Sequence, residues 1–545
     1  MKHKTPLRVR WLMRGRATSF ISLFFAGTAL TFVSLSAAQT QPSVTTQSAS
    51  ERAQTIKLID QLDDADPDIR VSATLRINGL GAGALDVAEA AAKREDLPPE
   101  TRKRLEKALT FIRPRAIVEQ RRASRDTWRS NLFHNAYRNS GHTNPKYDAF
   151  AHAAIDQYLA IRIDPLNAPA DLHDQAIAAF ERAEQAGCDE PMIRALHRLA
   201  DGHMQGASSR PRRGDDALFY GCCTANYPVA LKFHLWASYV AAFRFVVSED
   251  VQLLADLMAQ ALATPGFPPE EIDERLDGLD RAGPGFLGKP DWKSFFRLYE
   301  TLAPDAVGPL LFRARETFNS AITFRGVKVR GNQFDDAALT EFERIVHSAV
   351  QIADTAYQRD PADGRAARFV LRTLMVIVQY TQRKDPALDV WFDRAVAADP
   401  DDLRPYELKL DYLQYTDAGI EEIMEFGHQC RQSQNWRGGV AMIIVSAHER
   451  VADRSGDRGA YFLQPQVWAD IQSAFEGGLI NFPEDIKRRC EYAKVAGQCG
   501  HWDVADREFQ KIGDHPVISV FGSDATFKYL RNKAHRLATA GTTDQ

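Results

Sequence analysis

The sequence predicts an all-α protein, an α-solenoid of stacked helix hairpins, and three observations support that fold class. Apolar residues recur at helical spacing from Ile56 onward, and turns rich in Asp and Pro separate the helical segments. In the second half of the chain, small or aromatic residues recur at positions i, i+4 and i+7, with a Pro five residues later. The 545 residues also exceed what one hydrophobic core usually supports, so we expect a repeat array or several domains.

Residues 1–38 have the layout of a signal peptide. Its basic residues are Lys2, Lys4, Arg8, Arg10, Arg14 and Arg16. An uncharged apolar run from Phe20 to Ala38 follows, and Ser36 and Ala38 supply the small side chains that a signal peptidase needs. The alternative is an uncleaved signal anchor, because the run approaches the roughly 20 residues that span a membrane. Both alternatives predict an exported protein, periplasmic or secreted, or one that meets the membrane only through this segment.

Residues 39–50 are polar and uncharged, and we predict a disordered linker there. The whole chain has a formal net charge of −4, and loss of the basic leader would make the mature chain more acidic. A protein that grips phosphate backbones normally carries a basic domain charge. We therefore expect no nucleic-acid partner.

Residues 51–114 predict short helices joined by Pro-containing turns with acidic caps. Asp66 precedes the first of these turns and Arg70 lies four residues later; Pro99 and Arg102 form a looser copy. This segment resembles a HEAT repeat, and the resemblance implies paired helices that stack on their neighbours.

Residues 115–204 are predicted to form tetratricopeptide-like hairpins, beginning with a basic helix over 115–129. That helix could be read as a nucleic-acid arm. Its charges are spread around the helix and Glu119 and Asp126 interrupt them, which favours a solvated connecting helix.

The recurring i, i+4, i+7 pattern predicts the second helix of successive hairpins across 291–535, ahead of a flexible tail at 536–545. Complete copies are Ala349, Ala353, Ala356 and Pro361; Leu388, Phe392, Ala395 and Pro400; and Ile471, Phe475, Gly478 and Pro483. Partial copies are Ala176, Phe180 and Ala183, and Ala505, Phe509 and Ile512. This spacing puts three side chains on one helical face, and the Pro begins the next unit because it cannot extend a helix. The pattern resembles the second helix of a tetratricopeptide repeat, although the Trp and Leu-Gly pattern of that family's first helix is mostly missing.

The segment from Asn435 to Arg454, with the Phe482-Pro483 break and the helix end from Ala505 to Gly513, resembles the C-terminal half of a poorly characterised bacterial domain of helical hairpins. That resemblance implies a tetratricopeptide-like fold and assigns no activity.

Residues 205–290 are predicted to be a helical insert, because loops rich in Pro and Gly lie at 205–216 and 264–290. The apolar stretch 230–247 inside it is long enough to suggest a membrane span. Its interrupting residues are Lys232, His234 and Arg244. These residues favour a helix buried in a soluble core.

The six cysteines are Cys188, Cys222, Cys223, Cys430, Cys490 and Cys499. In an oxidising compartment they permit up to three disulfides, and Cys490 with Cys499 is the first pair to test. The alternative is that most are buried small apolar residues of a chain large enough to fold without disulfides.

Catalytic, cofactor and metal sites are not predicted. His448-Glu449 lacks the second His of a zinc-peptidase pair, since residue 452 is Ala. A grouping of His203, Cys222, Cys223 and His234 lacks the two-residue spacer of a zinc site. The Asp-rich turns at 63–66 and 399–402 are better explained as helix N-caps than as calcium loops.

The sequence therefore predicts a binding scaffold for a protein or peptide partner in the cell envelope, because stacked hairpins create extended concave surfaces. Trp436 and Arg437, beside two glycines, are the candidate binding surface, with core packing or a capping turn as the alternative. The alternative function is a hydrolase whose unrecognised active site lies in the 217–290 part of the insert. A purely structural envelope protein is a third alternative.

Overall fold

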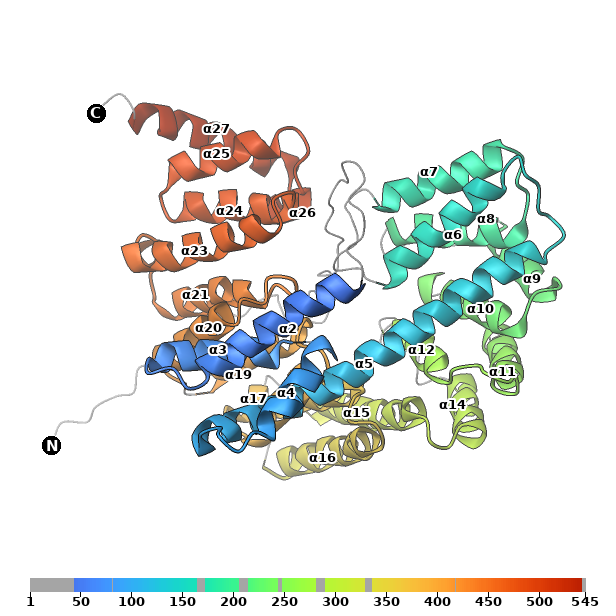
Figure 1. The fold of residues 1–545 in the computed structure, drawn as a ribbon, viewed down its shortest axis with the longest axis horizontal. Helices are drawn as coiled ribbons and strands as arrows, with labels where there is room; N and C mark the ends of the chain where they lie inside the picture. The colour runs from blue at the N-terminus through green and yellow to red at the C-terminus, as the bar shows by residue number, and fades with distance from the viewer. Residues whose placement is uncertain are drawn as a thin grey trace.

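The computed structural model describes residues 44–80, 82–163, 172–204, 214–243, 248–280, 290–328, 336–416 and 418–541. Every regular element in these residues is a helix, so the predicted all-α fold class is confirmed (Figure 1). The predicted signal peptide or anchor, residues 1–38, lies outside the described residues. Within them, no helix combines the length and the apolar character needed to cross a membrane.

The N-terminal unit has its own small hydrophobic core, to which Leu62, Ile77 and Leu105 contribute fully buried side chains. Its elements are α2 (Val44–Gln61), α3 (Pro67–Asn78), η1 (Ala82–Ala84), α4 (Leu85–Ala92) and the start of α5 (Pro99–Arg138). The Asp66 carboxylate caps α3 by accepting from the backbone N–H of Asp68, and the Arg70 guanidinium donates to the carbonyl of Ala65. The capping role predicted for this Asp-rich turn is confirmed.

Helix α2 begins at Val44, so the last seven residues of the predicted linker 39–50 are helical. That part of the prediction was wrong, because a polar, uncharged segment without Gly or Pro after residue 42 can extend a helix whose apolar face packs downstream. Helix α27 likewise continues to Gly541, into the predicted flexible tail.

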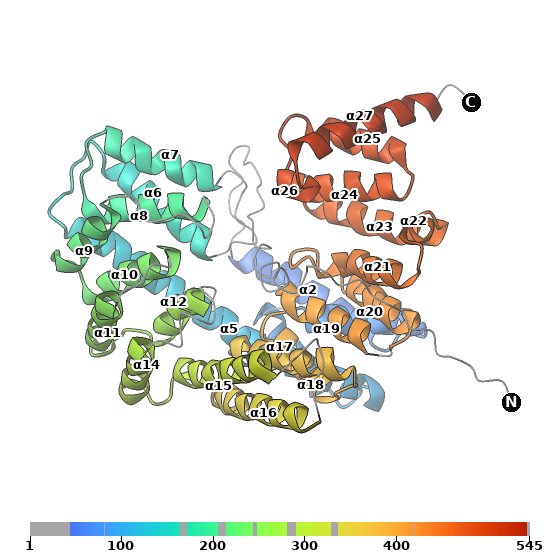
Figure 2. The ribbon, with the colours of Figure 1, turned by 180° about the vertical axis from the view of Figure 1, so that it is seen from behind.

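Helix α5 is 40 residues long and crosses the molecule, as both ribbon views show (Figures 1 and 2). The predicted boundary between residues 114 and 115 falls inside it, at an internal Pro114. A Pro removes one backbone hydrogen bond without stopping the helix when the residues on both sides are held by packing. Helix α5 therefore joins the N-terminal unit to the middle of the chain as one continuous element.

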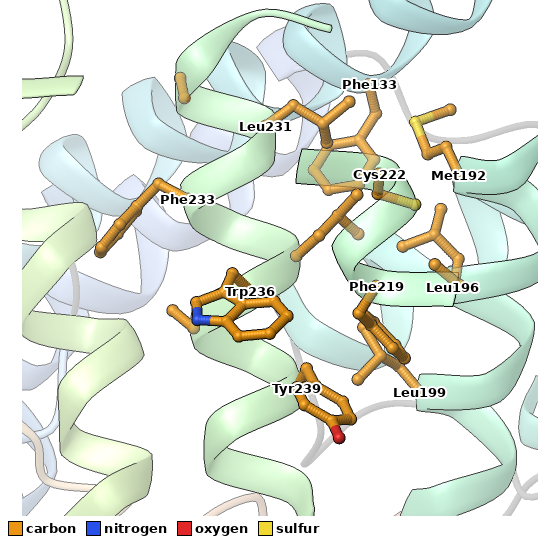
Figure 3. Close-up of a cluster of buried hydrophobic side chains, with 14 of the residues drawn as sticks. Phe133, Met192, Leu196, Leu199, Phe219, Cys222, Leu231, Phe233, Trp236 and Tyr239 are labelled. Atoms are coloured by element: carbon orange, nitrogen blue, oxygen red, sulfur yellow. The ribbon is translucent and has the colours of Figure 1, made fainter. Parts of the chain in front are cut away.

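The middle of the chain has one hydrophobic core whose residues run from Phe133 to Phe312, and Figure 3 shows part of it. Its helices are α6 (Asp148–Ile163), α7 (Leu172–Gln185), α8 (Pro191–Met204), α9 (Asp215–Thr224), α10 (Val229–Phe243), α11 (Ser248–Leu262), α12 (Glu270–Asp280) and α14 (Pro290–Leu302). Side chains of α8, α9 and α10 interdigitate in this core, so the predicted boundary at residue 205 does not divide it. We call α6 to α14 the arm, and the predicted insert is part of this arm rather than a separate unit. Helix α10 is buried in this core, as predicted.

The C-terminal part is a succession of packed helices with two further cores, one centred on α15 to α21 and one on α23 to α27. Its helices up to α21 are α15 (Val307–Lys328), α16 (Asp336–Arg359), α17 (Gly364–Thr381), α18 (Ala387–Ala398), α19 (Leu403–Tyr415), α20 (Ile420–Gln432), η2 (Val440–Met442) and α21 (Ile443–Arg454). The remaining helices are α22 (Arg458–Phe462), α23 (Pro465–Asn481), α24 (Ile486–Gln498), α25 (Trp502–Ile512), α26 (Ile518–Phe521) and α27 (Asp524–Gly541).

The turns that lead into α17, α19 and α24 share one construction. The carboxylates of Asp363, Asp402 and Asp485 each cap the following helix by accepting a backbone N–H two or three residues ahead. A Pro lies two residues before each of these caps, where it ends the preceding helix. Each Pro that follows the recurring pattern is thus a turn residue.

The N-terminal unit folds back onto the C-terminal part. Helix α5 packs on α18, and α3 packs on α20 (Figures 1 and 2). The Arg121 guanidinium of α5 also forms an ion pair with Asp360. The N-terminal unit is therefore connected to the first half of the C-terminal part through space as well as through the backbone.

Candidate functional site

The predicted surface residues Trp436 and Arg437 lie in the turn between α20 and η2. The indole of Trp436 is half-buried: the Arg431 guanidinium lies 4.6 Å from its ring centroid, and the edge of its six-membered ring packs on Gly477 of α23. A Cβ at Gly477 would lie 2.5 Å from the indole, so only Gly permits this approach. The geometry gives Trp436 a packing role between α20 and α23 while leaving part of the ring exposed.

Arg437 points toward the turn between α18 and α19. Its Nε lies 3.8 Å from a carboxylate oxygen of Asp401, and its side chain is about half exposed. Asn435 holds the same turn by donating to Asp401 over 2.8 Å, and Gly438 approaches so closely that a Cβ would lie 2.5 Å from the Cα of Asp401. The two turns form a rigid base under the candidate surface.

Helix α23 extends this surface past Trp436. Ser473, Gly477 and Ile480 lie at i, i+4 and i+7, and therefore on one face of the helix. Arg431 donates to the Ser473 hydroxyl over 2.8 Å, while Ile480 is 81% exposed. We call Arg431, Trp436, Ser473, Gly477 and Ile480 the α20–α23 strip.

A groove of about 320 Å³ lies where α2 and α3 meet α20. Its lining residues are Gln61, Asp68, Ile69, Ser72, Arg76 and Gln432, and we call it the junction groove. Ile69 is more than one-third exposed, and Gln432 directly follows Arg431 of the α20–α23 strip. The sequence did not reveal this groove, because its walls are far apart in the chain. The one available signal was Ile69 beside Val71, two exposed apolar residues on a short helix.

A buried cluster of charged and polar side chains lies where α12 packs against α5 and α10. The Glu271 carboxylate is fully buried, accepts from Arg129 of α5 over 2.8 Å and accepts from His234 of α10 over 2.9 Å. Arg275, one turn further along α12, lies 3.0 Å from the same carboxylate. We call Arg129, His234, Glu271 and Arg275 the α12 ion cluster.

The charges in this cluster fix its protonation. Burial acts to raise the pKa of Glu271, but the positive charges of Arg275 and Arg129 and the hydrogen bond from His234 outweigh it and hold that pKa below its ordinary value. Burial lowers the pKa of His234 to about 3, so its imidazole is neutral and donates from Nδ1 to Glu271. The Nε2 atom of His234 has no hydrogen-bond partner among the described residues.

This His and Glu pair does not offer a substrate access to its reactive atoms. His234 is 1% exposed and Glu271 is fully buried, in the part of the chain predicted to hold a hydrolase site under the alternative function. The opposite side of α12 carries Asp273, which accepts from Arg365 of α17 over 2.9 Å. Helix α12 thus joins α5 and α10 to α17, and we assign the α12 ion cluster a positioning role.

His448, the first residue of the His-Glu pair that resembles the start of a zinc-peptidase motif, is buried, and both of its ring nitrogens form hydrogen bonds. Its Nδ1 lies 2.9 Å from the Tyr461 hydroxyl and its Nε2 lies 3.2 Å from Asp470. Nowhere in the described chain do three or more His, Cys, Asp or Glu side chains converge as metal ligands. The side chain of His203, which the sequence groups with Cys222, Cys223 and His234, lies outside the described residues.

All six cysteines are free, and only Cys223 is partly exposed. Cys490 and Cys499 lie on and just after α24, nine residues apart, which corresponds to about 13 Å along a helix axis. A disulfide needs Cα atoms within about 7 Å, so this first candidate pair was wrong. Five of the six thiols instead pack as small apolar groups.

No protein-family model matches the chain, and no curated protein matches it. The resemblances to HEAT and tetratricopeptide repeats therefore stay predictions.

Proposed function

We propose that this protein is an exported helical-repeat scaffold that holds a protein or peptide partner in the cell envelope, and that it does so at the junction groove and the α20–α23 strip. The observation that carries the proposal is the 81% exposure of Ile480 on the α20–α23 strip, whose Arg431 directly precedes Gln432 of the junction groove.

Exposure and rigidity both favour partner binding at this surface. A large apolar side chain that is four-fifths exposed, as Ile480 is, is stabilised when a partner covers it. The neighbouring Trp436 and Arg431 are residue types that dominate binding energy at interfaces. Both are already held in place, so little conformational entropy is lost when a partner binds.

The cellular location in this proposal rests on the leader of the sequence. A cleaved or anchored N-terminal segment would place the folded body outside the cytoplasm in either case. The partner is then an envelope or secreted protein, and the membrane is met only through the N-terminal segment if it stays uncleaved.

A site-specific photo-crosslinker tests the surface directly. We would place it at Ile480 and, in a matched control, at Val390 of α18, which is 51% exposed on another part of the surface. The expected result in intact cells is a discrete crosslinked species from position 480 and none from position 390. Mass spectrometry of that species identifies the partner.

The substitution Ile480→Asp should weaken recovery of the same partner by about tenfold, which corresponds to roughly 1.4 kcal/mol, while Val390→Asp should leave it unchanged. Circular dichroism of both variants checks that the fold is retained. Equal crosslinking from both positions, or no loss with Ile480→Asp, would reject this surface. Turnover in a broad hydrolase screen by a protein that captures no partner would support the hydrolase alternative instead.

A further inference from the structure

Two histidines face each other where α5 meets α6. The Nδ1 atoms of His134 on α5 and His152 on α6 lie 2.7 Å apart, and their ring centroids are 4.9 Å apart. The other nitrogen of His134, Nε2, lies 2.8 Å from the carboxylate of Asp156, one turn beyond His152 on α6. Both rings are partly buried, and Tyr137 of α5 packs its ring against His152 at a centroid distance of 5.1 Å.

This geometry permits one proton between the two rings, and no more. With both rings neutral, His134 donates its Nε2–H to Asp156, and its Nδ1 accepts the Nδ1–H of His152. If His134 alone gains a proton, it donates from both nitrogens and His152 changes tautomer to accept. If His152 also gains a proton, two N–H groups and two positive charges meet at 2.7 Å, and the hydrogen bond is lost.

The charged surroundings of His152 agree with that conclusion. Burial, His134 and Arg138 of α5 lower its pKa, while Asp148 and Asp156 of α6 act in the opposite direction without cancelling them. Asp148 is itself engaged by the Tyr137 hydroxyl over 2.8 Å.

The contact joins two parts of the molecule. Helix α5 crosses the molecule, and α6 is the first helix of the arm formed by α6 to α14. The apolar residues that accompany the histidines are buried in the core of that arm. Their burial opposes release of α6 from the rest of the arm.

We propose that the His134–His152 pair is an acid-sensitive joint, closed at neutral pH, that releases α6 from α5 when His152 becomes a cation. In the open form His152 recovers an ordinary His pKa of about 6.5, so the open-to-closed ratio rises by about tenfold between neutral pH and pH 5.5. The step is a reversible gain of one proton and needs no other reactant.

Hydrogen exchange of the full chain, followed by mass spectrometry, tests the proposal at pH 7.5 and 5.5. For peptides from α6, Asp148–Ile163, we expect protection to fall by about tenfold at pH 5.5 beyond the intrinsic effect of pH on exchange. In His152→Gln, which keeps a hydrogen-bonding side chain without a titratable ring, this acid-dependent loss should disappear. His197→Gln is the matched control, because His197 lies on α8 of the same arm and pairs with Glu184.

Loss of α6 protection that is the same in wild type and His152→Gln would overturn the proposal, as would loss that only His197→Gln removes. If His152→Gln does not fold, His134→Gln answers the same question: it removes the facing ring, so the acid-dependent loss of α6 protection should be smaller than in wild type, and an unchanged loss would overturn the proposal.

Discussion

Removal of one cation from the α12 ion cluster should destabilise the middle of the molecule strongly. In Arg129→Met the replacement has a similar length and no charge, so packing along α5 is largely kept. The Glu271 carboxylate, which is fully buried, loses the partner that lies 2.8 Å away. A buried charge that loses a partner has no water to replace it, and that is the source of the cost.

The size of the destabilisation depends on the partners that Glu271 keeps in Arg129→Met. Breaking a buried ion pair by removing one partner typically costs about 3 to 5 kcal/mol. Glu271 keeps Arg275 and His234, so we expect the lower end, about 3 kcal/mol. For a unit of this size each kcal/mol lowers the melting temperature by about 2 to 4 °C, which predicts a decrease of roughly 6 to 12 °C.

Differential scanning calorimetry measures the effect, because a chain with several cores need not melt in one transition. The matched control is Arg313→Met, which removes an exposed arginine that lies 3.3 Å from Glu300. An exposed pair contributes less than about 1 kcal/mol, so this variant should melt within a few degrees of wild type. Equal melting temperatures for Arg129→Met and Arg313→Met would refute the assignment of a positioning role to the α12 ion cluster.

Three further predictions concern the turns, a histidine and the cysteines. Gly438→Ala should lower the free energy of unfolding by about 1 to 3 kcal/mol in urea titrations, because its Cβ has no space, whereas Gly221→Ala, with open space on a helix, should be neutral or slightly stabilising. Burial lowers the pKa of His448, so the contribution of its neutral ring to stability is complete above pH 6.5 and is lost as the pH falls below that value. Melting temperatures between pH 5 and 8 should therefore depend less on pH in His448→Asn than in wild type. An unchanged pH profile of the melting temperature would contradict this prediction. Peptide mapping without reductant should find no bond between Cys490 and Cys499, and a thiol reagent should modify them only in denaturant, since burial raises the pKa of each to about 11.

The hairpin pattern predicted buried faces correctly because it depends on local geometry. Ala349, Ala353 and Ala356 all lie on α16 and are fully buried, and their small side chains suit close packing against neighbouring helices. Residues spaced by four and three along a helix share a face in any tertiary context, so the sequence alone was sufficient. The Asp caps were predictable for the same reason, since a cap and its N–H group are two or three residues apart.

The α12 ion cluster was not predictable in this way. The segment from Glu270 to Arg275 has the composition of an exposed helix, and charged residues of this kind are rarely buried unless they are paired. The partner that makes burial affordable for Glu271, Arg129, lies 142 residues earlier in the chain. Periodicity carries no information about a partner at that separation. The sequence therefore suggested a separate helical insert, with an active site only under the hydrolase alternative, where the structure has a buried ion cluster.

The junction groove, like the α12 ion cluster, is formed by residues that are far apart in the chain. Ser72 on one wall and the carbonyl of Gln432 on the other are 360 residues apart, and they meet because α3 packs on α20 while α5 packs on α18. Neither wall has a motif of its own, since neither is a complete surface. A binding surface assembled from distant segments depends on the elements that hold those segments together, which here include the α5–α18 contact and the turn built around Gly438. Substitutions in these supports should therefore weaken partner binding without touching the partner, and Gly438→Ala, assayed by crosslinking from position 480, separates support from direct contact.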